Sequence, residues 1–236
     1  MKTLDHQLPL ALLVLVAMFP DAGRGGEPVR DEQASRGDGA GTTLNRLIDS
    51  EWEWRLREQP TFASYLGDRR YNDRWPDVSL IAITRRHQHR VEILETLKGI
   101  DGKALTADDR LNLDLITREY SVAVESHAHR WFLVPLTARG GIQDASSRAD
   151  VLRFETTRDF EQWIRRLLTF GRYMDQTIAL MQAGLDQRRV HDREVMVRVP
   201  AQISRQIVDD PTRSFFYKPF RRFPEGISSA DQQRLA

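Results

Sequence analysis

The histidines are the residues of this chain with the widest scope for metal binding or acid–base chemistry. Four of them form two pairs, His87 with His89 and His127 with His129, with one residue between the members of each pair. A helical zinc site needs ligands three or four residues apart, because that spacing places them on one face. Glu125 and His129 have this spacing, but two ligands do not complete a zinc site. We therefore predict no metal-binding residues and interpret Glu125 and His129 as a surface ion pair.

Motifs for nucleophilic catalysis or phosphate binding are also missing from the sequence. The chain has no cysteine, which excludes a cysteine nucleophile, thiolate zinc ligands and disulfides. It has no Gly-x-Ser-x-Gly elbow, and Gly140-Gly141 lacks the lysine and the preceding strand of a phosphate-binding loop. The acidic pairs Asp108-Asp109 and Asp209-Asp210 fit helix ends and turns. We predict no catalytic or cofactor-binding residues, and no cofactor in this chain.

An aromatic and basic segment, Phe215–Phe223, is the remaining candidate for binding. Such a segment can stack on nucleic-acid bases or meet a membrane surface, but the formal net charge of +1 gives no support for nucleic acid as a partner. We prefer a packed connection between helices, held by the aromatic side chains around Pro219. The numerous arginines are interleaved with Asp and Glu, which predicts solvated helix faces.

Residues 1–23 have the layout of a secretory signal peptide. Lys2 precedes an apolar run, Leu8–Phe19, which is followed by a turn and small residues. The run is about 12 residues long, whereas a membrane-spanning helix needs ~20, so we prefer a cleaved signal over a retained signal anchor. Residues 24–41 are mostly polar and are predicted to form a disordered linker. We expect an exported protein, periplasmic or extracellular, with no stable membrane span after cleavage.

Residues 42–236 are predicted to form an all-α domain, a helical array or bundle. Apolar residues recur at three- and four-residue spacing from Leu44 to Leu56 and from Leu80 to Leu97. Thr106, with Asp109 three residues later, resembles a capping box and predicts the start of a third helix.

The second half of the chain is predicted to be less regular. Residues 137–150 contain two adjacent glycines and few apolar side chains, which indicates a loop. A long helix is expected from Thr157 to Met181, with Gly171 as the point where it can be interrupted. Val195–Val199 alternates in the manner of a short strand. Short helices are expected from Pro60 to Gly67 and from Ser228 to Ala236.

Six short segments share their order and rough spacing with one bacterial family. They are Glu51–Arg57, Pro60-Thr61, Leu66–Arg74, Leu105–Asn112, Val199–Ile203 and Phe216–Phe220. Their combination resembles the N-terminal part of the DUF885 family, and the resemblance covers about residues 44 to 236.

The resemblance implies a helix-rich zinc metallopeptidase that is exported or lipid-anchored. Such proteins are usually much longer than this chain, and their histidine–glutamate metal motif lies in the C-terminal half. No family metal ligand maps onto this chain, so zinc and a peptide substrate are implied only for full-length relatives. We expect an N-terminal portion of such a protein, the non-catalytic helical part of a metallopeptidase-like hydrolase. The alternative is an exported helical binding or scaffold protein without enzymatic activity.

Overall fold

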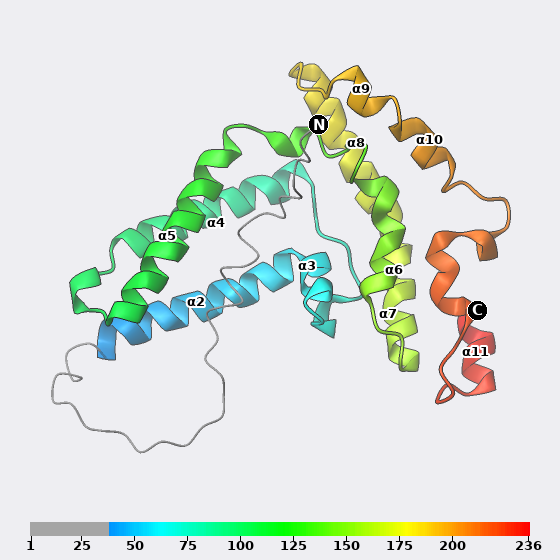
Figure 1. Cartoon of the computed structure of the whole chain (residues 1–236), viewed down its shortest axis with the longest axis horizontal. Helices are drawn as coiled ribbons and strands as arrows, with labels where there is room; N and C mark the ends of the chain where they lie inside the picture. The colour runs from blue at the N-terminus through cyan, green and yellow to red at the C-terminus, as the bar shows by residue number, and fades with distance from the viewer. Residues whose placement is uncertain (1–37) are drawn as a thin grey trace, which may run out of the picture. The chain divides into compact units, whose positions relative to one another are not determined.

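A computed structural model describes residues 38–236, which form two compact units (Figure 1). Within the described residues, unit 1 contains residues 38–51 and 85–129, and unit 2 contains residues 52–84 and 130–236. The described residues form helices and turns with no strand, apart from an isolated β-bridge between Thr137 and Gly140. The prediction of an all-α fold is confirmed.

Unit 1 is built by three helices, two of which, α2 and α4, also supply residues to unit 2. Figure 1 shows α4 and α5 side by side. The third helix, α5, begins as predicted, because the Thr106 hydroxyl accepts the backbone N–H of Asp109. Apolar residues from the three helices and from the connection between α4 and α5 form the core: Leu44, Leu97, Leu105, Leu113 and Ile116. The elements are α2 (Asp38–Glu58), α4 (Leu80–Lys98), the 3-10 turn η3 (Gly102–Ala104) and α5 (Ala107–His127).

The first segment of unit 2 turns sharply between two short helices. Helix α3 (Pro60–Tyr65) begins at the proline expected there and is followed by Gly67, whose φ of +84° lies in the region that glycine adopts most easily. The Asp68 carboxylate then accepts the backbone N–H of Arg70 and starts the 3-10 helix η2 (Arg69–Tyr71). The predicted short helix and its end are both confirmed.

The predicted loop at residues 137–150 is partly helical. After η4 (Trp131–Leu133), the chain forms η5 (Ile142–Ser147) and α6 (Arg148–Val151). Ala145 and Ala149 are buried in these elements, so small side chains allow close packing without a strong apolar pattern. The loop prediction is therefore wrong for residues 142–150.

The predicted long helix is two helices, α7 (Thr157–Leu168) and α8 (Phe170–Asp186). The break falls at Thr169, shortly before the glycine where an interruption was expected. The Arg166 carbonyl accepts the Thr169 hydroxyl at 2.9 Å and the Trp75 indole N–H at 2.8 Å. The Thr169 backbone N–H also donates to this carbonyl, at 3.2 Å in a 3-10 pattern. The contact from Trp75, and not a glycine, thus marks the position of the break.

The C-terminal part of unit 2 alternates short helices and turns. The strand expected at residues 195–199 is wrong, because the Val197 backbone N–H bonds the Arg193 carbonyl in helical fashion. Ser228 caps the last helix as predicted, by accepting the Asp231 N–H. The elements are α9 (Arg193–Met196), α10 (Val199–Ser204), η6 (Pro211–Arg213), η7 (Phe215–Arg221) and α11 (Ser229–Leu235).

The core of unit 2 is aromatic. Phe160 and Trp163 of α7 are fully buried and pack with Phe220 of η7. The Trp163 indole N–H also donates to the Phe216 carbonyl at 3.0 Å. The aromatic and basic segment is thus a packed connection, as preferred from the sequence.

The predicted signal peptide, residues 1–23, and most of the predicted linker lie outside the described residues. Helix α2 already begins at Asp38, before the expected start of the helical region at residue 42. Within residues 38–236, none of the helices is long and apolar enough to cross a membrane.

Candidate functional site

The histidines of α4 have different neighbours. The His87 ring stacks on the His127 ring, with centroids 3.8 Å apart and planes at 9° to each other. His89 instead contacts Glu51. Two nearly parallel rings direct their nitrogens within separate planes, so the His87–His127 pair does not present two nitrogens to one metal ion.

Glu125 and His129, the pair with helical ligand spacing, are both exposed, and His129 lies beyond the end of α5. In the part of the chain that the structure describes, no three His, Cys, Asp or Glu side chains gather in a way that could hold a metal. These residues therefore do not fit the zinc ion that the family resemblance implies for full-length relatives.

Glu51 carries a buried carboxylate, with 6% of the residue exposed. Its oxygens accept a hydrogen bond from the Tyr120 hydroxyl at 2.5 Å and one from His89 Nε2 at 2.8 Å. A carboxylate has only acceptors, and here donors from α4 and α5 both reach it. The Glu51 cluster, which we define as Glu51, His89 and Tyr120, ties the three helices of unit 1 together.

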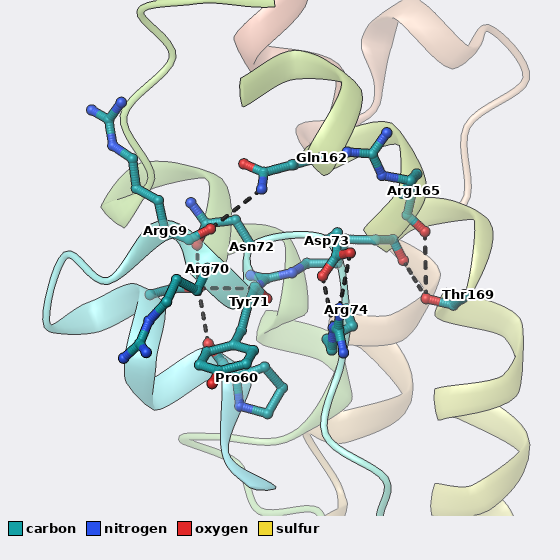
Figure 2. A network of polar contacts seen from close by, with 12 residues as sticks. Pro60, Arg69, Arg70, Tyr71, Asn72, Asp73, Arg74, Gln162, Arg165 and Thr169 are labelled. Atoms are coloured by element: carbon teal, nitrogen blue, oxygen red, sulfur yellow. Dashed lines mark hydrogen bonds and ion pairs between the residues drawn. The ribbon is translucent and has the colours of Figure 1, made fainter. Parts of the chain in front are cut away.

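In unit 2, the conspicuous polar feature is the loop of residues 68–74, which falls within one of the family-like segments (Figure 2). Arg74 pairs with the neighbouring Asp73 at 2.7 Å, and this hydrogen bond lowers the pKa of the Asp73 carboxyl. Gln162 of α7 donates to the Arg69 carbonyl at 3.3 Å. The loop is therefore attached to α7 through its backbone and through Arg69, whose guanidinium lies 3.5 Å from the buried Asp159 carboxylate. Its other charged side chains pair nearer the surface.

Arg70 continues this surface pairing. Its guanidinium bonds Asp68 at 2.7 Å and Glu53 at 2.7 Å, and the hydrogen bond from Arg70 lowers the pKa of Asp68. Because the Arg70 side chain is half exposed, water screens these pairs and each contributes little to stability.

Arg166 differs from the other arginines of this region because it is fully buried, with 0% exposed. Its Nη2 donates to the Ser64 hydroxyl and to the Tyr71 carbonyl, both at 2.9 Å. Its Nε and Nη1 are buried without a hydrogen-bond partner. Burial lowers the pKa of Arg166 to about 10, although the charge of Asp73 acts in the opposite direction.

The face of Trp75 supplies a further contact to this cation. The Arg166 guanidinium carbon lies 5.5 Å from the Trp75 ring centroid, within the range of a cation–π interaction. Tyr173 stacks on Trp75, with centroids 5.2 Å apart and planes at 2°, and burial raises the pKa of its phenol. We define Arg166, Ser64, Tyr71 and Trp75 as the Arg166 network, which fixes the loop and the break between α7 and α8.

A separate pocket of about 230 Å³ opens beside the C-terminal end of α8. It is lined mainly by apolar side chains, and its ionisable lining residues are Arg189 and His191. The His191 Nε2 lies 3.3 Å from the Val134 carbonyl. This α8 pocket is lined by residues 133–136, Met181, Leu185, residues 189–191 and Met196. A pocket lined mainly by apolar side chains can bind an apolar group.

The sequence signals missed both the Arg166 network and the α8 pocket. Interleaved charges suggested that the arginines are solvated, and only one local signal distinguishes Arg166 from the exposed Arg165. Residues 133–136 and 181–191 come together only through the fold. The short spacing of Trp163 and Arg166 on α7 was the one available signal, since it places an arginine on the same face as a core tryptophan.

One family model matches the chain. No curated protein matches the chain. The family described as "Bacterial protein of unknown function (DUF885)" matches residues 60–236, which contain unit 2 from α3 onward and also residues 85–129 of unit 1. The match covers well over half of the chain, in agreement with the resemblance drawn from the six segments. The chain therefore belongs to the DUF885 family.

Proposed function

We propose that this chain is exported and forms a non-catalytic helical lobe of a metallopeptidase-like hydrolase. In this proposal the catalytic zinc is held by another portion of such an enzyme, and the lobe packs against that portion and forms one wall of the substrate cleft. The proposal builds on the family membership and on the resemblance to exported metallopeptidases.

The observation that carries the proposal is an apolar face on α8. Met174, Ile178, Met181 and Leu185 recur at three- and four-residue spacing, so they share one side of the helix. Ile178 is 62% exposed and Leu185 is 58% exposed. We define these four residues as the α8 face. A contiguous exposed apolar face of this kind is typical of a surface that packs against another protein part.

The test is to express this chain together with the C-terminal portion of a longer family member that contains a histidine–glutamate zinc motif. We expect the two proteins to co-purify, and binding of a hydrophobic dye by the lobe to decrease in the complex. Ile178→Asp should abolish co-purification, because it places a charge in the middle of the α8 face.

The matched control is Ile81→Asp. Ile81 is 83% exposed and lies on α4, outside the α8 face, so this variant should still co-purify. The lobe proposal is wrong if the wild-type chain does not co-purify with the zinc-containing portion and binds no hydrophobic dye by itself. The alternative, a self-sufficient exported binding or scaffold protein, would then be preferred.

A further inference from the structure

The α8 pocket is shaped by the way α8 ends. The backbone N–H of Arg189 returns to the Gly184 carbonyl at 2.8 Å, and that of Arg188 bonds the Leu185 carbonyl at 3.0 Å. This is the Schellman pattern, here with Arg188 in the left-handed conformation, φ +57°. It turns the chain back, so that residues 189–191 come to lie beside the end of α8.

Gly184 brings the opposite wall of the pocket close to α8. A Cβ atom at this position would lie 2.5 Å from the Leu133 carbonyl oxygen and 2.9 Å from the Arg189 carbonyl oxygen. Both approaches are shorter than real Cβ contacts, so only glycine allows the two backbone segments to come this close to the helix. The pocket is thus bounded by two backbone segments that are anchored to the same helix turn.

Two methionines line this pocket. Met181 of α8 and Met196 of α9 are both half-buried and belong to the lining, whereas Met174, the remaining methionine of residues 38–236, lies outside it. The chain has no cysteine, so its sulfur atoms are all thioethers. A methionine side chain is unbranched and has three rotatable bonds, and the volume of about 230 Å³ leaves room for both sulfurs to turn inward.

His191 adds an imidazole to the same lining, in an orientation that suits metal binding. Its Nε2 lies 3.3 Å from the Val134 carbonyl oxygen. Because a carbonyl only accepts, Nε2 carries the hydrogen, and Nδ1 of the neutral ring keeps its lone pair. Metal-binding histidines almost always donate their other N–H to a carbonyl, a carboxylate or water, which fixes the ring and its tautomer.

The apolar lining decides which kind of ion the pocket can hold. Thioether sulfurs select soft ions such as Cu(I), whereas carboxylates, carbonyls and water suit Mg²⁺, Ca²⁺ and Mn²⁺. Desolvating an ion costs free energy that rises with the square of its charge, so an apolar pocket disfavours a divalent ion more strongly than a monovalent one. Arg189 borders the pocket with its aliphatic stem, because the surface that it helps to form is mainly apolar.

We propose that the α8 pocket is a binding site for Cu(I), with the Sδ atoms of Met181 and Met196 and the Nδ1 atom of His191 as its ligands. The two thioethers provide the preference for a soft monovalent ion, and the imidazole is held in place by the Val134 carbonyl. This site is independent of the lobe proposal, because it uses no residue from another protein part.

The first experiment titrates the full chain with Cu(I) in anaerobic buffer, in competition with the coloured indicator ferrozine. We expect the chain to withdraw about one Cu(I) per molecule from the indicator and to show no comparable binding of Zn²⁺. A second measurement on the wild-type chain uses Ag(I), which shares the charge and the ligand preference of Cu(I), and methionine labelled at its methyl group. The NMR signals of Met181 and Met196 should shift, whereas that of Met174 should not.

Matched variants locate the ligands. Met181→Leu and Met196→Leu keep nearly the same volume and should each weaken Cu(I) binding about tenfold or more, since even a change beyond the direct ligands costs about 10–100-fold in metal affinity. Met174→Leu, on the same helix but outside the lining, should bind as the wild type does. His191→Gln should weaken binding, whereas the exposed His129→Gln should not.

The other outcomes overturn the inference. If the wild-type chain withdraws no Cu(I) from ferrozine and the methyl signals stay unchanged with Ag(I), the pocket is not a soft-metal site. Binding that persists in the double variant Met181→Leu, Met196→Leu would assign the metal to other donors of the chain. Equal affinities for Zn²⁺ and Cu(I) would contradict the role given to the thioethers. None of these results bears on the co-purification test with Ile178→Asp.

Discussion

Unit 1 and unit 2 each bury an ionisable side chain but surround it differently. In the Glu51 cluster, a phenol and an imidazole donate to the carboxylate, so hydrogen bonds replace the water that burial removed. In the Arg166 network, only Nη2 has hydrogen-bond acceptors, both of them neutral, and an indole face lies against the cation. Within the described residues, a buried charge is therefore maintained either by saturating its hydrogen bonds or by enclosing it among aromatic rings.

The difference has an energetic consequence. A buried donor without an acceptor is unfavourable by about 1–3 kcal/mol, and more when it is charged. Arg166 has two such nitrogens, Nε and Nη1. The Glu51 cluster should thus behave as a simple tie between helices, whereas the Arg166 network should be sensitive to both the shape and the charge of the residue at its centre.

The largest expected effect is that of Arg166→Ala. This change leaves a cavity beside Trp75 and removes the donor to Ser64 and Tyr71, so we expect a loss of about 3–5 kcal/mol in the free energy of unfolding. Arg166→Met refills much of the volume without a charge and should lose only about 1–2 kcal/mol. Urea unfolding measures both values.

The exposed neighbour Arg165 provides the control, because Arg165→Ala should change stability by no more than about 0.5 kcal/mol. Equal losses for the alanine and methionine variants of Arg166 would show that its charge, and not its packing, is the important property. The contrast with the Glu51 cluster would then disappear.

A smaller loss is expected for Glu51→Gln, about 1–3 kcal/mol. The amide retains the shape of the side chain but replaces one acceptor oxygen with a donor facing His89 or Tyr120. Glu53→Gln is the matched control on the same helix, at a side chain that is 48% exposed, and it should lose less than about 1 kcal/mol. Urea unfolding measures both losses. Similar losses at both positions would contradict the role of Glu51 in holding the three helices of unit 1 together.

The pH dependence of stability tests whether Tyr173 is enclosed by its aromatic neighbours. Burial raises its pKa in the folded state, so above about pH 10 the unfolded chain releases this proton before the folded chain does. The folded state then binds more protons, and stability falls as pH rises through this window, by up to about 1.4 kcal/mol per pH unit from this residue.

Tyr173→Phe should lack this part of the loss of stability at alkaline pH. Tyr65→Phe, at a tyrosine that is 56% exposed, should lose stability with rising pH as the wild type does. Urea unfolding at pH 9, 10 and 11 gives the comparison. Identical pH slopes for wild type and Tyr173→Phe would mean that the phenol is not shielded from water.

The smallest effect is expected at the surface pair of Asp68 and Arg70. The hydrogen bond from Arg70 lowers the Asp68 pKa, so its contribution is present above about pH 4 and is lost as pH falls below that value. Asp68→Asn retains an acceptor oxygen for the Arg70 N–H, and we expect a loss below about 1 kcal/mol at pH 7. The difference in stability between wild type and Asp68→Asn should vanish near pH 2. A difference that persists in acid would mean that Asp68 stabilises the fold by capping η2 and not by its charge.

Local signals predicted the elements whose ends are set by local chemistry. Thr106 and Ser228 cap helices with their own hydroxyls, and Gly67 takes a positive φ, so the sequence near each end is enough to place it. The break at Thr169 depends on Trp75, 91 residues from Arg166. A helix end set by such a partner leaves no mark in the surrounding sequence.

The same distinction applies to the candidate sites. Spacing identified Glu125 and His129 as a pair, but both are exposed, while the buried Glu51 carboxylate receives donors from helices 38 and 69 residues away. The α8 pocket depends on a glycine whose role is visible only once Leu133 lies against it. Burial and convergence are properties of the fold, and single-sequence patterns do not encode them directly.

The partners of Arg166 also affect the order in which this chain acquires its structure. Ser64, Tyr71 and Trp75 precede Arg166 by 102, 95 and 91 residues. A ribosome adds about 5–20 residues per second, so the 68–74 loop is synthesised roughly 5–20 seconds before the side chain that fixes it. During that interval Trp75 has no α7 to pack against, and the nascent chain exposes an indole that a chaperone can recognise.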